Sequence, residues 1–139
     1  MRELVIDTSV IVKWFFEEKN TELALRVRES YVKGDIELYS PDLIIYELAN
    51  VFRYGKIEES LAKEFLQDFY DMQITLIQPN QNLINNTLTF ALNHDITIYD
   101  SIYLILAKEL GIKAISADNK LYKKTESTDL IILLEDFKV

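Results

Sequence analysis

Short apolar runs alternate with longer amphipathic segments along this chain. Apolar runs rich in β-branched residues predict buried strands at residues 4–6, 36–39, 74–77, 114–116 and 130–134. Apolar positions at helical spacing predict helices from residue 21 to about 34 and over residues 42–54, 58–72, 80–93 and 100–110. Strands separated by helices at this spacing are typical of α/β folds, so we expect a mainly parallel central sheet of about five strands.

Cap and turn residues mark the ends of several predicted helices. Ser40 and Pro41 are predicted to be the N-cap and the first residue of a helix. Asn80 or Asn82 is the N-cap candidate for the helix that reaches residue 93. Gly111 follows the last of these helices, in the position where a left-handed glycine commonly ends a helix.

The composition narrows the classes of protein further. With 139 residues, 49% of them hydrophobic and 27% charged, the chain is typical of one globular domain over residues 1–139. The absence of cysteine excludes a disulfide scaffold, a thiolate metal site and a cysteine nucleophile. No apolar run is long enough to span a bilayer, and the first residues lack the pattern of a signal peptide. We therefore expect a cytoplasmic protein with no membrane partner.

The net charge points away from nonspecific binding of nucleic acid. The 15 Lys and Arg residues against 23 Asp and Glu residues give a formal net charge of −8. An acidic surface repels both nucleic acid and anionic membrane. This expectation depends on where the acids lie, because a few of them stand outside the exposed, mixed-charge segments.

Four acids occupy positions in apolar surroundings. Asp7 directly follows the first predicted strand, and Asp118 comes two residues after the end of another. Asp100 opens a helix that is apolar nearly all round, and Glu47 lies in mid-helix among apolar residues one turn away. Ligands of open α/β sheets bind outside the carboxyl ends of the strands, and we expect these acids to gather there.

Each acid taken singly has an ordinary structural explanation. Asp7, Asp100 and Asp118 can each cap a helix or fill a turn, and Glu47 can pair with Arg53 or reach water. Together they need partners, because a buried carboxylate normally protonates, pairs with a cation or binds a metal. Oxygen donors without His or Cys nearby suit a hard cation, so the set predicts a site for Mg²⁺ or Mn²⁺.

Hydroxyl and amide side chains accompany these acids along the sequence. They are Thr8, Ser9, Asn50, Ser101 and Asn119. Groups of this kind orient the carboxylates of metal sites. The alternative, that the hydroxyl groups only cap helices, is compatible with this role.

Four segments carry a resemblance to a known family. They are VIDTSVI at residues 5–11, PDLIIYELANV at residues 41–51, IYDSIYL at residues 98–104 and SADNKL at residues 116–121. In this order, spread from residue 4 to about residue 134, they resemble the motifs of PIN-domain nucleases. Chain length and motif style are most similar to the VapC-type toxin ribonucleases of toxin–antitoxin systems.

The resemblance implies a three-layer α/β/α fold and a metal-dependent endoribonuclease, the toxin of a type II toxin–antitoxin pair. Asp7, Glu47, Asp100 and Asp118 carry over, position by position, as the catalytic acids and the ligands of Mg²⁺ or Mn²⁺. An RNA substrate, a homodimer and a cognate antitoxin whose tail blocks the site are implied as partners. Some relatives have a further acid two residues after the last motif aspartate. This chain has Lys120 there, so it lacks a carboxylate that could help to hold a second metal.

The positions of the four acids suggest which of them bind the metal and which orients the attacking water. Asp7 and Asp100 are the first candidates for direct metal ligands, because both lie at element ends that converge on one edge. Asp118 is expected to bind the metal directly or through water, and Glu47 to orient the attacking water or complete the set of ligands. No nucleophilic side chain is needed, and Ser9 has no neighbouring histidine to activate it.

Several side chains near the acidic motifs are candidates for contact with RNA. The basic candidates are Lys13, Arg53, Lys56, Lys120, Lys123 and Lys124. Trp14, Phe15 and Phe16 are candidates for base stacking, although we favour packing in the core or a dimer interface for the two phenylalanines. His94 is interpreted as a surface or turn residue rather than a catalytic base, because a single histidine lacks an oriented partner.

Two other functions stay open at this point. A non-catalytic PIN-like module that binds RNA or protein would keep the fold but cleave nothing. A housekeeping RNA-processing PIN nuclease would work without an antitoxin. A nucleotide-binding α/β protein is set aside, because the three glycines are too far apart to form a phosphate-binding loop.

Overall fold

Five parallel strands form the centre of the molecule. The computed structural model describes residues 2–138. Its strands are β1 (Arg2–Ile6), β2 (Ile36–Pro41), β3 (Thr75–Ile77), β4 (Lys113–Ser116) and β5 (Ile131–Leu133). Their order across the sheet is β3-β2-β1-β4-β5, and every pairing is parallel. The prediction of an α/β fold with a mainly parallel sheet of about five strands is confirmed.

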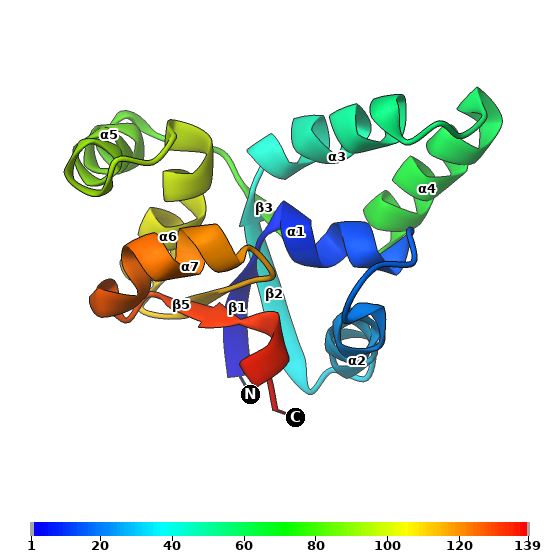
Figure 1. The fold of residues 1–139 in the computed structure, drawn as a ribbon, viewed down its shortest axis with the longest axis horizontal. Helices are drawn as coiled ribbons and strands as arrows, with labels where there is room; N and C mark the ends of the chain where they lie inside the picture. Colours follow the sequence, from blue (N-terminus) through cyan, green and yellow to red (C-terminus); the bar gives the residue numbers. More distant parts are fainter. Residues whose placement is uncertain (1, 139) are drawn as a thin grey trace.

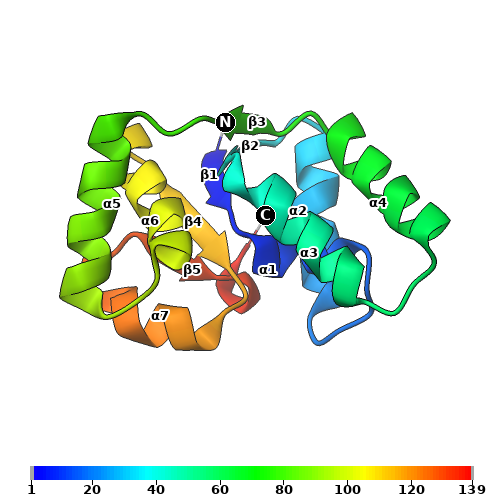
Figure 2. The ribbon, with the colours of Figure 1, turned by 90° about the horizontal axis from the view of Figure 1, so that it is seen from above.

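Helices join the strands and cover both faces of the sheet. The α-helices are α1 (Thr8–Ile11), α2 (Thr21–Val32), α3 (Leu43–Tyr54), α4 (Glu59–Asp71), α5 (Gln81–His94), α6 (Ile98–Leu110) and α7 (Asn119–Thr125). Three short 3₁₀ segments accompany them: η1 (Val12–Trp14), η2 (Glu126–Thr128) and η3 (Leu134–Asp136). In Figures 1 and 2, α5 and α6 lie on one side of β1 and β2, with α2, α3 and α4 on the other, which gives the predicted three-layer arrangement. No helix within residues 2–138 is long and apolar enough to cross a membrane.

A buried strand and a buried helix hold the candidate site in place. Leu4, Val5 and Ile6 of β1 are nearly inaccessible to solvent, and every side chain of α6 from Ser101 to Ala107 is buried. A central parallel strand covered on both faces needs no polar side, and a helix that is apolar all round must be covered. α6 packs on β1, β2 and β4, so the end of β1 and the start of α6 keep a fixed relation.

The second strand runs further than predicted. Ser40 and Pro41 are its last two residues and pair with Leu76 and Ile77 of β3, so the prediction that they open a helix is wrong. Asp42 occupies the N-cap position of α3 instead. Pairing with β3 continues the sheet through this segment, and a proline at the end of a strand removes no essential ladder hydrogen bond.

The helix that carries Asp100 begins earlier than predicted. α6 starts at Ile98, and the hydroxyl of Thr97 caps it by accepting the backbone N–H of Asp100 at 3.0 Å. Asn80 caps α5 as predicted, because its side chain accepts a backbone N–H of the first turn at 2.8 Å. Gly111 ends α6 at φ 70°, which confirms the predicted left-handed terminus.

An aromatic cluster joins the α3–α4 hairpin to the segment after α1. The rings of Phe15 and Phe16 lie with their centroids between 5.0 and 6.0 Å from those of Phe52 and Phe65. Trp14 donates its indole N–H to a backbone carbonyl of α2 at 2.8 Å. Packing inside the molecule, the role favoured for Phe15 and Phe16, is therefore the one observed.

Candidate active site

The ends of two neighbouring strands bring the first and last candidate acids to one edge of the sheet. In the β1–β4 pair Ile6 lies opposite Ile115, and the backbone N–H of Asp7 donates to the carbonyl of Ile115 at 3.2 Å. Asp118 lies two residues beyond the end of β4. The expected meeting of the two strand ends is therefore present, at the carboxyl edge where open α/β sheets bind ligands.

Asp7 is a buried carboxylate. Only 7% of the residue is exposed, and its Oδ1 accepts the backbone N–H of Ser9 at 2.5 Å as the N-cap of α1. Burial raises the pKa of Asp7 to about 6, and the charge of Glu47 adds to this, while hydrogen bonds from Ser116 and Ser9 oppose it. The capping role is thus real, and it leaves the charge of Asp7 uncompensated by any ion pair within residues 2–138.

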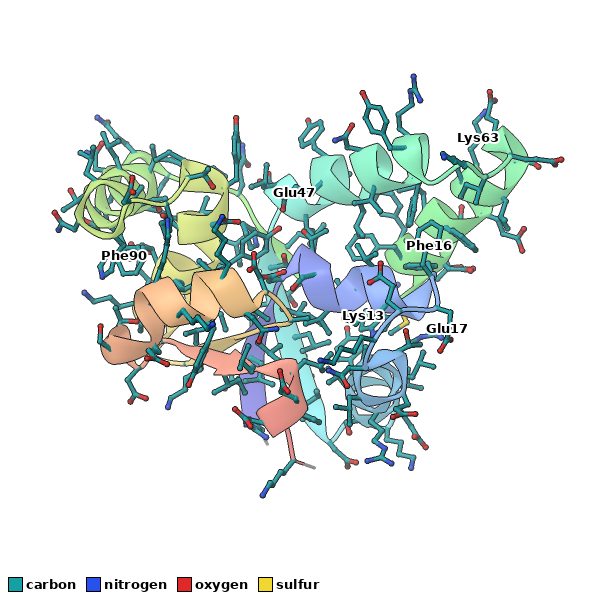
Figure 3. All side chains as sticks on the ribbon, in the orientation of Figure 1. Lys13, Phe16, Glu17, Glu47, Lys63 and Phe90 are labelled. Atoms are coloured by element: carbon teal, nitrogen blue, oxygen red, sulfur yellow. The ribbon has the colours of Figure 1, made fainter. Side chains whose placement is uncertain are left out.

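Glu47 is held by two hydroxyl groups from other elements. The hydroxyl of Thr8 donates to Oε1 of Glu47 at 2.8 Å, the hydroxyl of Tyr103 donates to the same oxygen, and the two hydroxyl oxygens lie 2.9 Å apart. Figure 3 shows Glu47 near the start of α3, above α1. No ion pair within residues 2–138 joins Glu47 to Arg53. Burial, followed by the charge of Glu47, raises the pKa of Tyr103, so its hydroxyl stays a neutral donor.

Asp100 lies in the first turn of α6 and is half-buried. Burial is the largest cause that raises the pKa of Asp100, and the negative charges of Asp118 and Glu47 raise it further. Lys124 acts in the opposite direction. Carboxylates disfavour each other's charged forms when they are close. The side chains of Asp100, Asp118 and Glu47 therefore lie within range of one another's charge.

Asp118 and two serines tie together the segments that follow β1 and β4. Asp118 caps α7 by accepting the backbone N–H of Leu121 at 3.0 Å. The Oγ of Ser116 accepts the N–H of Asp118 at 3.0 Å and lies 3.3 Å from the Oγ of Ser9. The Oγ of Ser9 also accepts the N–H of Ala117 at 2.8 Å. These bonds fix Asp118 relative to the end of β1.

The residues expected to accompany the acids divide into two groups. Thr8 and Ser9 are hydrogen-bonded to groups of the site, to Glu47, Asp7 and Ser116. Ser101 is buried inside α6 and donates to the backbone carbonyl of Thr97, one turn earlier, at 2.7 Å, so its side chain neither caps the helix nor hydrogen-bonds to one of the four acids. Asn50 and Asn119 are exposed, and their side chains make no hydrogen bond to other residues of the described range 2–138.

Two polar residues of the site were not given a role from the sequence. Tyr103 places a phenol in an otherwise apolar stretch of α6, and Ser116 ends a buried strand. A buried phenol or hydroxyl needs a hydrogen-bond partner, and this requirement is the signal that could have pointed to them. Both residues reach groups that flank Asp7.

A cavity opens between the start of α6 and α7. Its volume is about 400 Å³, and it is lined by Asp95, Ile96, Thr97, Asp100, Asp118, Lys120, Leu121 and Lys124. Two of the four candidate acids therefore border a space that a segment of a large ligand can enter. Lys120 and Lys124 are the basic candidates from the sequence that line this cavity.

A larger hollow of about 700 Å³ lies between α5 and α6 and is lined by none of the four acids. His94 and Phe90 are among its lining residues, and their rings stack with centroids 4.0 Å apart. The Nδ1 of His94 lies 3.0 Å from the carbonyl of Phe90. His94 is thus the last residue of α5, packed on its own helix and away from the acids, which agrees with its interpretation as a surface residue.

The donor set suits a hard divalent cation. All four acids offer oxygen, none is in an ion pair within residues 2–138, and burial together with mutual repulsion raises the pKa of Asp7 and Asp100. As they stand, no three His, Asp or Glu side chains of the described residues lie close enough together to hold a metal ion. The acids form an electrostatic cluster whose side chains would have to move closer together to coordinate a cation.

Comparison with known proteins places this geometry in a family. The PIN domain family model matches residues 4–127. The curated protein Ribonuclease VapC3 from Pyrobaculum aerophilum is 30% identical over 127 residues, which cover 88% of this chain and 94% of the relative. The structure of VapBC-1 from nontypeable Haemophilus influenzae matches with a TM-score of 0.70 at 16% identity, over 96% of this chain and 99% of that one. A toxin–antitoxin complex from Klebsiella pneumoniae matches with a TM-score of 0.64 at 12% identity, over 98% and 99% of the two chains.

Proposed function

This chain belongs to the PIN domain family, and from that premise we propose that it is a metal-dependent endoribonuclease, the toxin of a type II toxin–antitoxin pair. The observation that carries this proposal is the cluster of Asp7, Glu47, Asp100 and Asp118 at the carboxyl edge of the sheet, none of which forms an ion pair within residues 2–138. A relative that is 30% identical over nearly all of the chain carries the name ribonuclease. The family and the acid cluster support the same activity.

Asp7, Asp100 and Asp118 would hold Mg²⁺ or Mn²⁺, and Glu47 would complete the site or orient water. When bound, the cation supplies a Lewis acid that stabilises charge on the scissile phosphate and makes water nucleophilic near neutral pH. Thr8 and Tyr103 both donate to Oε1 of Glu47. This arrangement holds the carboxylate in one orientation and leaves Oε2 available to accept a proton from a water molecule.

The proposed substrate is RNA, entering through the cavity between α6 and α7. Asp100 and Asp118 line that cavity, so a phosphodiester segment within it would lie beside the proposed metal ligands. A cytoplasmic location is part of the proposal, because a ribonuclease must share a compartment with its RNA substrate. In the presence of a bound cation, the local field at the strand ends would be less negative than the net charge of −8 suggests.

The proposed protein partner is a cognate antitoxin whose tail blocks the site. Solved toxin–antitoxin complexes from two bacteria contain chains of the same fold. The acidic excess of this chain favours a partner segment that carries basic residues. A small upstream gene that encodes a DNA-binding protein would support the toxin role, and its absence would favour the housekeeping nuclease.

We also propose a homodimer formed through α5. Ile84, Leu88 and Leu92 repeat every four residues along this outer helix and are 38%, 50% and 75% exposed. Residues 81–94 include no Asp, Glu, Lys or Arg. The core of a protein interface is depleted of charge in the same way, whereas the exposed face of a monomer's outer helix is normally charged.

A non-catalytic RNA- or protein-binding module is the alternative from another functional class. Such a module would not need four clustered carboxylates, whose charges are costly to bury together, and all four are present here.

The test of the proposed activity is incubation of the purified chain with total RNA in Mg²⁺ or Mn²⁺, followed by sequencing of the RNA ends. We expect cleavage that EDTA abolishes and that Asp7→Asn removes without unfolding the chain. Asp68→Asn, at an exposed position of α4, is the control. Intact RNA under all conditions would favour the non-catalytic module.

A further inference from the structure

The basic side chains proposed for RNA contact differ in where they lie. Lys13 forms an ion pair with Glu18 at 3.3 Å, with its own side chain only 12% exposed. The guanidinium of Arg53 lies over the ring of Tyr54 at the end of α3. Lys13 lines a separate, small hollow of about 50 Å³ together with Ala117 and Asn119. These positions do not border the cavity that Asp100 and Asp118 line.

Lys120 and Lys124 do border that cavity. They are four residues apart on α7, so they lie on one face of the helix, one turn from each other. The same cavity is lined by Asp100 and Asp118. Lys123 belongs to the same short helix and is exposed but does not line the cavity. The helix therefore directs two of its three lysines to the site and one elsewhere.

A hydrogen bond fixes one of these ammonium groups at the rim. The Nζ of Lys124 donates to the backbone carbonyl of Asp95 at 2.9 Å, which links α7 to the turn between α5 and α6. An ammonium group has three donors, so two remain for another acceptor. Neither Lys120 nor Lys124 forms an ion pair with any residue in the range 2–138. Their charge is available to a ligand in the cavity.

The cavity needs positive charge of its own if a nucleic acid is to enter it. Three acids line it, namely Asp95, Asp100 and Asp118, and they repel a phosphodiester. A cation bound by Asp100 and Asp118 would attract one phosphate. The neighbouring phosphates of the same strand would still face carboxylates unless lysines at the rim attracted them.

We propose that Lys120 and Lys124 form a phosphate-binding subsite that holds the RNA backbone next to the scissile bond. The ligand is the phosphate of a single-stranded RNA that flanks the one bound at the acids. The lysines position substrate and take no part in the bond-breaking step. This proposal rests on the proposed ribonuclease function, because that function supplies the RNA. It adds which residues hold the strand and on which side of the acids it lies.

The experiment measures binding separately from cleavage. Asp7→Asn chains, which are expected not to cleave, are titrated in EDTA with a fluorescein-labelled single-stranded RNA of random sequence at several KCl concentrations. Each phosphate contact contributes about −0.7 to the slope of log K against log[salt] for single strands. We therefore expect the Lys120→Ala, Lys124→Ala double substitution to weaken binding and to make the slope shallower by about 1.4.

Two matched variants exclude a merely structural effect. Lys123→Ala removes a lysine of the same helix that does not line the cavity, and its slope should equal that of the parent chain. Lys124→Arg keeps the charge, and its slope should stay close to that of the parent chain. The proposal is overturned if the double substitution leaves the salt slope unchanged or if Lys123→Ala changes it equally.

A separate assay keeps this proposal apart from the ribonuclease function. With Lys120 and Lys124 changed to alanine in the otherwise unmodified chain, KM for RNA should rise while kcat changes little. If the unmodified chain binds RNA through the lysines but never cleaves it, the ribonuclease proposal fails and the subsite stands. If it cleaves RNA and the lysines do not matter, the subsite fails and the ribonuclease proposal stands.

Discussion

The hydroxyl of Thr8 donates a hydrogen bond to the Oε1 of Glu47 at 2.8 Å, across 39 residues of sequence. Thr8 directly follows the buried Asp7, so this bond links the acid at the end of β1 to the acid on α3. Tyr103 donates to the same oxygen from α6. Three elements therefore determine the orientation of a single carboxylate.

Thr8→Val tests whether this bond serves the chemistry. The valine keeps the shape of the threonine and removes the hydroxyl that orients Glu47. Removal of groups that orient metal-site carboxylates typically costs about 10–100-fold in metal affinity or activity, and we expect a loss of that size in Mn²⁺-dependent cleavage. Thr8→Ser retains the hydroxyl and should keep most of the activity. Equal activity of the two variants would show that the bond is only structural.

The buried charge of Asp7 predicts a pH-dependent stability. Its pKa is about 6 in the folded chain against 3.8 normally, so the folded state binds more protons between these values and stability falls as pH rises through the interval. By the same relation, ionisation of Asp7 costs on the order of 3 kcal/mol near neutral pH without metal. Asp7→Asn avoids that cost and keeps a good N-cap residue for α1.

Urea unfolding in EDTA measures this effect. We expect Asp7→Asn to be more stable than the unmodified chain at about pH 7.5, and the difference to shrink to near zero at about pH 3, where Asp7 is mostly protonated in both the folded and unfolded states. A difference of the same size at both pH values would mean that the substitution acts through packing. That result would contradict the assigned burial of a charged Asp7.

Divalent cations should stabilise the folded chain at neutral pH. A ligand that binds only the folded state at about 100 times its Kd adds about 2.7 kcal/mol to the free energy of unfolding. We expect Mg²⁺ or Mn²⁺ to raise Tm at pH 7.5, and the increase to be lost in Asp7→Asn and in Asp100→Asn. Asp68→Asn should retain it. The same increase in all four chains would place the cation elsewhere.

Much of the fold was predictable because its signals are local. The apolar runs of β1 and β4 and the apolar residues around α6 specify burial directly in the sequence. The role of Ser40 and Pro41 was mistaken because their pairing with β3 depends on residues more than thirty positions away. The short helices α1 and α7 were not predicted, since four and seven residues are too few to show a helical period.

The candidate site was predictable in its acids and less so in the groups that hold them. Asp7 and Asp118 were indicated by their place after buried strands, which is a property of local sequence. The contact of Tyr103 with Glu47 joins residues 56 positions apart, and no spacing rule contains it. Ser101 was predicted to have a role in the site because it lies beside Asp100. Its hydroxyl donates to the backbone carbonyl of Thr97 instead.

The uncharged face of α5 predicts that the dimer interface lies on this helix. We expect the unmodified chain to sediment at about twice its 16.3 kDa mass, and the Leu88→Glu, Leu92→Glu double substitution to sediment as a monomer. Val32→Glu changes an equally exposed apolar residue on α2 and should leave the dimer intact. A double variant that stays dimeric would place the interface on another surface.

The most direct test of the central claim is a paired titration with Mn²⁺, in which binding to the chain and the rate of cleavage of a defined RNA are measured over the same free concentrations. The account predicts that both rise with the same midpoint and that Asp100→Asn weakens both together, while Asp68→Asn changes neither. Cleavage at the full rate in EDTA, or in Asp100→Asn without measurable Mn²⁺ binding, would contradict a metal site built from these acids.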